Sequence, residues 1–148
     1  MPIHRSYGWS PDLPDHRDQL YSAPHPVLAA LPPKKDLRSK CPPVYDQGQL
    51  GSCTANALGA AIQFEQKKQG TTVFVPSRLF IYYNERVIEK TVNSDAGAQI
   101  RDGVKSVANL GVCPEKEWPY DITKFANKPP DICYTDAKKC EAVGYQRL

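Results

Sequence analysis

The chain has 148 residues, of which 41% are hydrophobic and 24% are charged, a composition typical of one folded globular domain. Its 19 basic and 16 acidic residues leave a net charge of +3 and are mixed along the chain, so no basic stripe indicates nucleic-acid binding. No apolar run approaches the ~20 residues that cross a bilayer, so we expect neither nucleic acid nor a membrane among the partners.

The N-terminal segment, residues 1–35, contains half of the 14 prolines of the chain and no helical or strand periodicity. Such a segment is expected to be extended and partly polyproline-like. Its tyrosine, tryptophan and leucine side chains are too numerous for an inert tail. We therefore predict a proline-rich extension that lies across the folded body.

Three helices are predicted after this extension. The first begins after Ser52, which has the chemistry of an N-cap, and ends before Gly70. The second starts at Pro76-Ser77 and places its apolar residues on one face as far as residue 87. The third covers residues 98–110 and ends at Gly111.

Two short strands complete the predicted elements. The first covers residues 71–75, between the first two helices. After residue 120 the sequence has the character of a loop. The last residues, 140–148, alternate enough to predict a single strand.

The five cysteines, at positions 41, 53, 113, 133 and 140, form no CxxC pair. A cysteine-rich zinc site is therefore not expected, and we predict free thiols, with no metal and no cofactor. The first residues lack the apolar stretch of ~7–15 residues that forms the core of a secretion signal. Both features favour a cytoplasmic protein.

The residues with the clearest chemistry are Cys53 and Gln47. A cysteine in the first turn of a helix has its thiolate stabilised by unpaired backbone N–H groups and by the helix dipole. Gln47 precedes it by six residues, across a glycine-flanked turn that can fold back. The side-chain N–H of Gln47 and the backbone N–H of Cys53 would then form an oxyanion hole, as used in acyl transfer. A buried structural cysteine is the alternative reading.

This part of the sequence resembles the papain-like cysteine peptidases, in which a D-W-R triplet precedes a Q-G-x-C-G-S-C-W block. The matching segments here are Asp36-Leu37-Arg38 and Val44-Tyr45-Asp46-Gln47-Gly48-Gln49-Leu50-Gly51-Ser52-Cys53. Later segments are similar in order and spacing to the second helix, the glycine loop and the Y-G-I and Y-P-Y segments of the family. They are residues 76–86, Asp95-Ala96-Gly97, 110–112 and 118–120.

The resemblance implies an α+β fold, the papain-like cysteine proteinase fold, mostly as its helical left domain with only the first strand of the β-barrel right domain. The implied organisation is an N-terminal extension over residues 1–35, a helical domain over 36–138 and the start of a truncated β domain over 139–148. It also implies that Cys53 is the nucleophile and Gln47 the oxyanion-hole donor. The implied substrate-binding residues are Gly51, Ser52, Ala96 and Gly97.

The sequence departs from the family pattern in three ways. Leu50 replaces the first cysteine of the block, so the disulfide that starts from this turn is missing, and Thr54 replaces the usual aromatic residue. No histidine follows Cys53, although the family places its base ~130–150 residues after the nucleophile. We therefore expect an incomplete chain that lacks the catalytic histidine and asparagine and is inactive alone. His4, His16 and His25 of the extension are poor substitutes, because proline-rich segments position side chains loosely.

The function implied by the resemblance is hydrolysis of peptide bonds in a peptide or protein substrate, through a cysteine thiolate and an acyl-enzyme. Residues 1–35 would then act as an inhibitory pro-segment that blocks the cleft. A non-catalytic module that binds a peptide or partner is the first alternative. A cysteine redox sensor, with Cys41 as the resolving thiol for Cys53, is the second.

Overall fold

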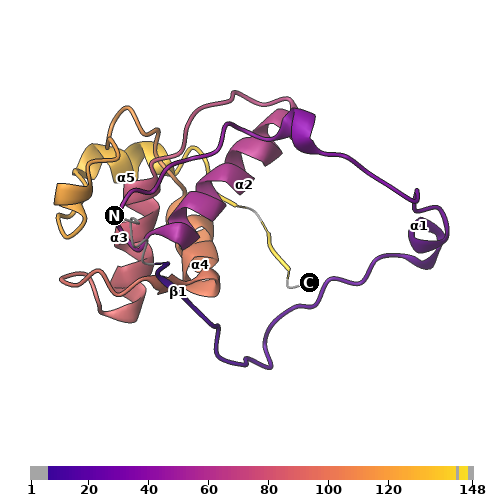
Figure 1. Ribbon diagram of the computed structural model, residues 1–148, viewed down its shortest axis with the longest axis horizontal. Coiled ribbons are helices and arrows are strands. Elements are labelled where there is room, and N and C mark those ends of the chain that lie inside the picture. Colours follow the sequence, from indigo (N-terminus) through magenta and orange to yellow (C-terminus); the bar gives the residue numbers. More distant parts are fainter. Residues whose placement is uncertain (1–6, 143, 147–148) are drawn as a thin grey trace, which may run out of the picture.

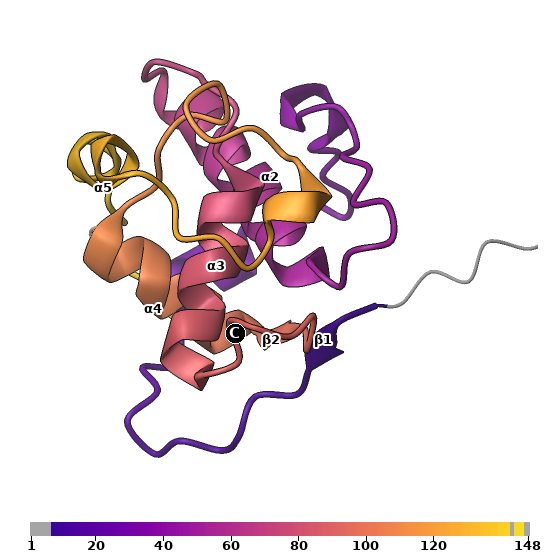
Figure 2. The ribbon, with the colours of Figure 1, turned by 90° about the vertical axis from the view of Figure 1, so that its left-hand side faces the viewer.

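The computed structural model describes residues 7–142 and 144–146. Three helices form the body of the protein: α2 (Cys53–Gln69), α3 (Arg78–Glu89) and α4 (Ile100–Leu110). Each of them packs against the other two, and α3 lies at the centre (Figure 2). Most residues of α3 are buried, on all of its faces, as expected for a helix enclosed by its neighbours.

The ends of these helices follow the local signals in the sequence. The Ser77 hydroxyl accepts a hydrogen bond from the backbone N–H of Phe80, which caps α3. Gly70, with φ of 68°, ends α2, and Gly111, with φ of 73°, ends α4. Positive φ is the backbone conformation that favours glycine, so these two stops were predictable. The predicted third helix is right except at its start, because residues 98 and 99 form a strand.

That strand, β2 (Ala98–Gln99), pairs in parallel with β1 (Trp9–Ser10) of the N-terminal extension. Trp9 is opposite Ala98, and the carbonyl oxygen of Gly8 accepts a hydrogen bond of 2.8 Å from the Ala98 N–H. Further contacts bind the extension to α4: Asp12 accepts from the Arg101 N–H, and Asp18 pairs with the Arg101 guanidinium at 2.6 Å. The first part of the extension therefore lies across the body, as predicted.

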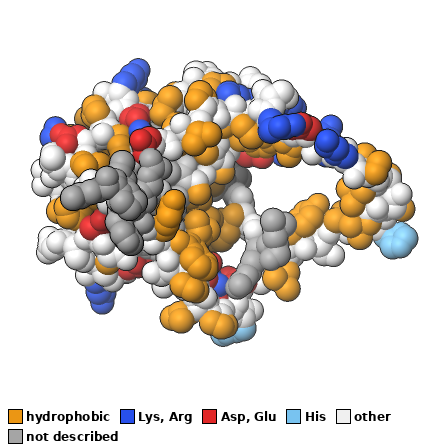
Figure 3. Space-filling model, in the orientation of Figure 1, with side chains coloured by type: hydrophobic (Ala, Val, Ile, Leu, Met, Phe, Trp, Pro, Cys, Tyr) orange, Lys and Arg blue, Asp and Glu red, His pale blue; other side chains and the backbone are white. Residues whose placement is uncertain are grey.

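The second part of the extension differs from this expectation. It runs away from the helical body in a wide loop, and at the end of that loop lies α1 (His25–Ala29), which has no buried residue (Figure 1). The prediction that no helix forms in residues 1–35 is therefore wrong at this point, because Pro24 and Pro26 begin a single turn. Orange hydrophobic side chains line this outer loop (Figure 3), including exposed Leu20, Tyr21 and Leu31.

The remaining elements are short. A 3-10 turn, η1 (Arg38–Lys40), precedes α2, and another, η2 (Ile122–Lys124), precedes α5 (Asp131–Ala137). The prediction of a loop after residue 120 is wrong for α5, which is too short to show a periodic pattern. No helix among the described residues is long and apolar enough to cross a membrane.

Neither predicted strand is present. Residues 71–75 form no strand; only Val75 accepts a backbone hydrogen bond, from Glu115. At the C-terminus, residues 140–142 and 144–146 contain no strand, and residues 143, 147 and 148 of the predicted segment lie outside the described residues. Both predictions are wrong because each segment makes a single backbone hydrogen bond to a distant described segment, Val75 with Glu115 and Cys140 with Val112, and one bond forms no ladder.

Candidate active site

Cys53 is the first residue of α2 and is half-buried. The first backbone hydrogen bond of this helix runs from the N–H of Asn56 to the carbonyl oxygen of Ser52. The predicted side-chain cap is absent, because the Ser52 hydroxyl accepts no hydrogen bond from a backbone N–H of the first turn. The amide end of α2 is therefore not occupied by this hydroxyl, and it lies where it can stabilise a thiolate at Cys53.

The Ser52 side chain is fully buried and belongs to a polar chain behind Cys53. Its hydroxyl lies 2.5 Å from the Tyr120 hydroxyl and accepts a hydrogen bond of 3.0 Å from the Asn56 side chain. Tyr120 in turn donates to the carbonyl oxygen of Gln47 at 3.0 Å. This chain of hydrogen bonds ties the start of α2 to the turn that carries Gln47.

Gln47 folds back toward the helix start, as the glycine-flanked turn predicts. Its side-chain amide donates a hydrogen bond of 3.0 Å to the carbonyl oxygen of Leu50. Gly48, with φ of 63°, makes the tight turn, and its N–H is held by the Asp46 carboxylate at 2.9 Å. An amide NH₂ has two hydrogen atoms, so Gln47 retains a second donor.

A buried arginine supports this turn from behind, and sequence reasoning did not identify it. Arg78 makes a two-pronged ion pair with Glu115, with both hydrogen bonds at 2.8 Å. The same guanidinium lies between the rings of Tyr45 and Tyr120, at 4.6 and 4.0 Å from the ring centroids. It also donates to the Asp46 carbonyl oxygen at 3.2 Å. Nothing in the spacing of Arg78 and Glu115, 37 residues apart, indicates their pairing.

A carboxylate anchors the other wall of the site. Both oxygens of Asp95 lie 3.0 Å from the Gly51 N–H, and Asp95 also accepts a hydrogen bond from the Tyr82 hydroxyl. Burial and the Asp95 carboxylate raise the pKa of Tyr82 well above its usual value, so this hydroxyl stays a donor. The Tyr82 oxygen accepts in turn from the Gly97 N–H at 3.2 Å. Gly51 and Gly97 are thus held close to one another.

The N-terminal extension passes between these two glycines. A methyl group on Gly8 would lie 2.0 Å from the carbonyl oxygen of Gly51 and 2.7 Å from the Cα of Gly97. A methyl group on Gly97 would lie 1.7 Å from the carbonyl oxygen of Gly8. Three backbones therefore meet at a distance that only glycine permits. Two of the residues predicted to bind substrate are covered here by the chain's own extension.

The other residues named from the sequence have varied surroundings. Ala96 is exposed beside Gly97, whereas Ser52 faces the interior. Thr54 replaces the family's aromatic residue with a buried hydroxyl that donates to Glu85 at 2.6 Å. His16 and His25 are exposed, and His4 lies outside the described residues. All five cysteines are free thiols, as expected.

Comparisons with known proteins find similar chains. The chain is 42% identical, over 163 aligned residues, to an uncharacterized peptidase C1-like protein of Acanthamoeba polyphaga mimivirus, covering 99% of this chain and 52% of that protein. It is 51% identical to xylellain, a cysteine protease from Xylella fastidiosa, whose crystal structure superposes with a TM-score of 0.88. That match covers 99% of this chain and 61% of xylellain.

The chain belongs to the papain-like cysteine peptidase family. Its fold is a partial papain-like fold, mostly helical with a small parallel sheet. The chain spans about half the length of the curated relative that it matches. A structure from work on the mite allergens Blo t 1 and Der p 1 shares the fold at 21% identity, with a TM-score of 0.54 over 62% of this chain and 31% of that one. No family model matches the sequence.

Proposed function

We propose that this chain carries the nucleophile and oxyanion hole of a cysteine peptidase that hydrolyses peptide bonds. The sulfur of the Cys53 thiolate attacks the carbonyl carbon of the peptide bond, whose oxygen becomes negatively charged. The second N–H of Gln47 and the backbone N–H of Cys53 receive this oxyanion. The intermediate collapses, the amine leaves with a proton, and water then hydrolyses the thioester.

The observation that supports this proposal is the geometry of the helix start. Cys53 is half-buried at an amide terminus that the Ser52 side chain does not cap. The Gln47 side chain folds back to the Leu50 carbonyl oxygen, three residues before Cys53. The base that accepts the thiol proton has no candidate after Cys53 in these 148 residues. We assign it to the part of the protein that corresponds to the unmatched length of the relatives.

The proposed substrate is a peptide in extended conformation that pairs with the backbone near Gly97. Support comes from the extension itself, because β1 adds to β2 as a strand at this edge. While residues 8–10 lie there, a substrate cannot occupy the same backbone. The proposal therefore includes self-inhibition by the extension, through occupancy of the Gly51 and Gly97 surface.

The alkylation rate of each cysteine by iodoacetamide tests the assignment of the nucleophile. Peptide mapping by mass spectrometry gives each rate in one experiment. Cys41 is the control, because it is exposed and lies outside a helix start. We expect Cys53 to react at least about tenfold faster than Cys41 near neutral pH, although it is less exposed. Equal rates would overturn the assignment and favour the alternative, a module that binds a peptide or partner without catalysis.

A further inference from the structure

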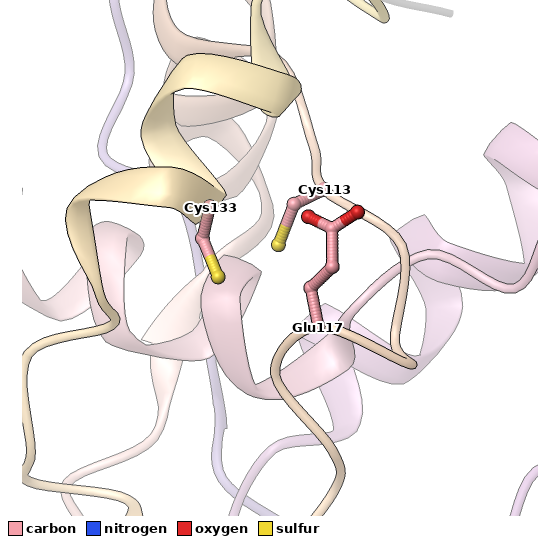
Figure 4. A group of neighbouring side chains, drawn as sticks. All are labelled: Cys113, Glu117 and Cys133. Carbon is pink, nitrogen blue, oxygen red and sulfur yellow. The ribbon is translucent and has the colours of Figure 1, made fainter.

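A second group of chemically reactive side chains lies apart from the candidate active site. Cys113, Glu117 and Cys133 each bring one ligand atom to within 4.8 Å of the others. Figure 4 shows the two sulfur atoms facing one another, with the Glu117 carboxylate beside Cys113. Both cysteines are completely buried. The proposed peptidase chemistry uses none of these three residues.

The backbone holds the three residues in place before any ligand binds. The carbonyl oxygen of Cys113 accepts a hydrogen bond of 2.8 Å from the Ser77 N–H at the start of α3. Glu117 lies in a turn closed by its own N–H and the Pro114 carbonyl oxygen, at 3.0 Å. Cys133 lies in the first turn of α5, where its N–H donates to Pro130 at 2.9 Å. The three donors therefore come from two connected segments that are already folded.

One ligand atom of the cluster is buried without a partner. The Oε2 atom of Glu117 is shielded from solvent and has no hydrogen-bond partner. A cation bound between the three groups would give this oxygen the partner that it lacks.

We propose that Cys113, Cys133 and Glu117 bind one divalent, thiol-seeking metal ion of the Zn²⁺ class. Two thiolates and one carboxylate are ligands that Zn²⁺ accepts, and a water molecule would complete its usual four-coordinate shell. The ion would hold the segment that follows α4 against α5. This site lacks the CxxC spacing of common zinc motifs, because 19 residues separate its two cysteines.

Binding would follow a defined proton balance. Each thiol must release its proton before its sulfur can coordinate the ion. Affinity should therefore rise with pH, by up to about tenfold per pH unit for each proton released.

The test uses the full chain with its thiols reduced and with chelators removed. Cd²⁺ is added while the ultraviolet charge-transfer band between thiolate and metal is recorded, and Zn²⁺ is then used to displace it. We expect one equivalent to bind with the band intensity of two thiolates. Zn²⁺ should also raise the melting temperature of the chain, because it binds the folded state.

Variants distinguish this site from other thiols. C113S and C133S should each remove the band of the bound equivalent, and E117Q should weaken binding at least about tenfold. The matched control C41S, which changes an exposed thiol, should bind as the unchanged chain does. If a serine variant fails to fold, the Cd²⁺ affinity of E117Q tests the site by itself, because glutamine keeps the shape of the glutamate side chain.

Three results would overturn the proposal. One is Cd²⁺ binding that persists in C113S and C133S, which indicates adventitious binding by other thiols. Another is unchanged affinity in E117Q. The third is a disulfide between Cys113 and Cys133 in the chain as isolated, with no Zn²⁺ bound after reduction. The proposed peptidase function does not depend on this site, so the two can fail independently.

Discussion

The carboxyl group of Glu85 accepts a hydrogen bond of 2.6 Å from the hydroxyl group of Thr54, in the interface between α2 and α3. Glu85 is completely buried, and its other oxygen has no hydrogen-bond partner. Burial raises the pKa of Glu85 to about 8; the Thr54 hydrogen bond and Arg86 oppose this shift, and Glu89 and Asp102 add to it. The residue is therefore a neutral acid at neutral pH.

Glu85 should make the stability of the fold depend on pH. The folded state keeps a proton that the unfolded chain, with a carboxyl pKa of 4.5, releases. The free energy of unfolding should then fall as pH rises from about 4.5 to about 8, by up to about 1.4 kcal/mol per pH unit, and this loss should level off above pH 8. Urea unfolding at a series of pH values measures this slope.

The variant E85Q isolates the contribution of this carboxyl group. It replaces the acid by a neutral group of the same shape, so the slope between pH 5 and 8 should be smaller than in the unchanged chain. The control E65Q alters a partly exposed glutamate of α2 and should keep the slope. A slope of the same size in E85Q and the unchanged chain would contradict the prediction.

Gly103 allows α4 to approach α3 at this buried acid. A methyl group there would lie 2.4 Å from the Leu58 side chain and 2.6 Å from the Glu85 carboxylate. We expect G103A to lower the free energy of unfolding by about 1–2 kcal/mol, because the clash outweighs the gain in helix propensity. G59A is the matched control, since its nearest contact would be 3.3 Å. The prediction fails if G103A is as stable as G59A in urea unfolding.

Gly8 should decide whether the extension stays on the Gly51 and Gly97 surface. The variant G8A places a methyl group 2.0 Å from the Gly51 carbonyl oxygen, so the extension must move away. Hydrogen exchange at the Ala98 N–H, which donates to Gly8, should then accelerate at least about tenfold. Alkylation of Cys53 by iodoacetamide should become faster in the same variant.

The control for this experiment is G144A, since a methyl group there has no neighbour within 4 Å. It should leave both the Ala98 exchange rate and the Cys53 alkylation rate as they are in the unchanged chain. Unchanged Ala98 protection in G8A would mean that β1 does not pair with β2 in solution.

Arg78 should contribute strongly to stability through its shape as well as its charge. The variant R78K retains the charge but loses the fork that binds Glu115 and the planar group between Tyr45 and Tyr120. We expect a loss of about 1.5–3 kcal/mol in the free energy of unfolding, measured with urea.

The Arg38 and Asp36 pair provides a matched comparison for Arg78. It has a similar forked geometry, but Arg38 is largely exposed. R38K should therefore change the free energy of unfolding by less than about 1 kcal/mol. Similar losses in the two variants would show that burial of Arg78 adds nothing.

The predicted helices were right where the sequence carries local signals. Ser77 caps α3, and Gly70 and Gly111 stop α2 and α4, because each of these effects depends on one residue and its immediate neighbours. Ser52 shows the limit of this logic. Its hydroxyl has the chemistry of a cap, yet a tyrosine 68 residues away provides the partner it uses.

The parts of the site that escaped prediction depend on contacts between distant segments. The pairing of Trp9 with Ala98 joins residues that are 89 positions apart. A strand of two residues is too short to show a periodic pattern, so the sequence does not predict this pairing. The Arg78 and Glu115 ion pair is similar, since a lone arginine in a helix is most often a solvated residue. The position of Cys53 and the turn of Gln47 were accessible because both lie within one short motif. Their roles as nucleophile and oxyanion-hole donor stay predictions.

The strand pairing of Trp9 and Ser10 has a consequence for any competing ligand. The extension is tethered to the surface that it covers, so its pairing with β2 is intramolecular and has a fixed effective local concentration. A free peptide must displace the tethered extension before it can bind, so the apparent affinity of the surface for the peptide is reduced. The exposed loop around α1 is a place where proteolysis can cut the tether. After a cut there, the severed segment would dissociate and be diluted. The Gly51 and Gly97 surface would then stay exposed, because cleavage is irreversible.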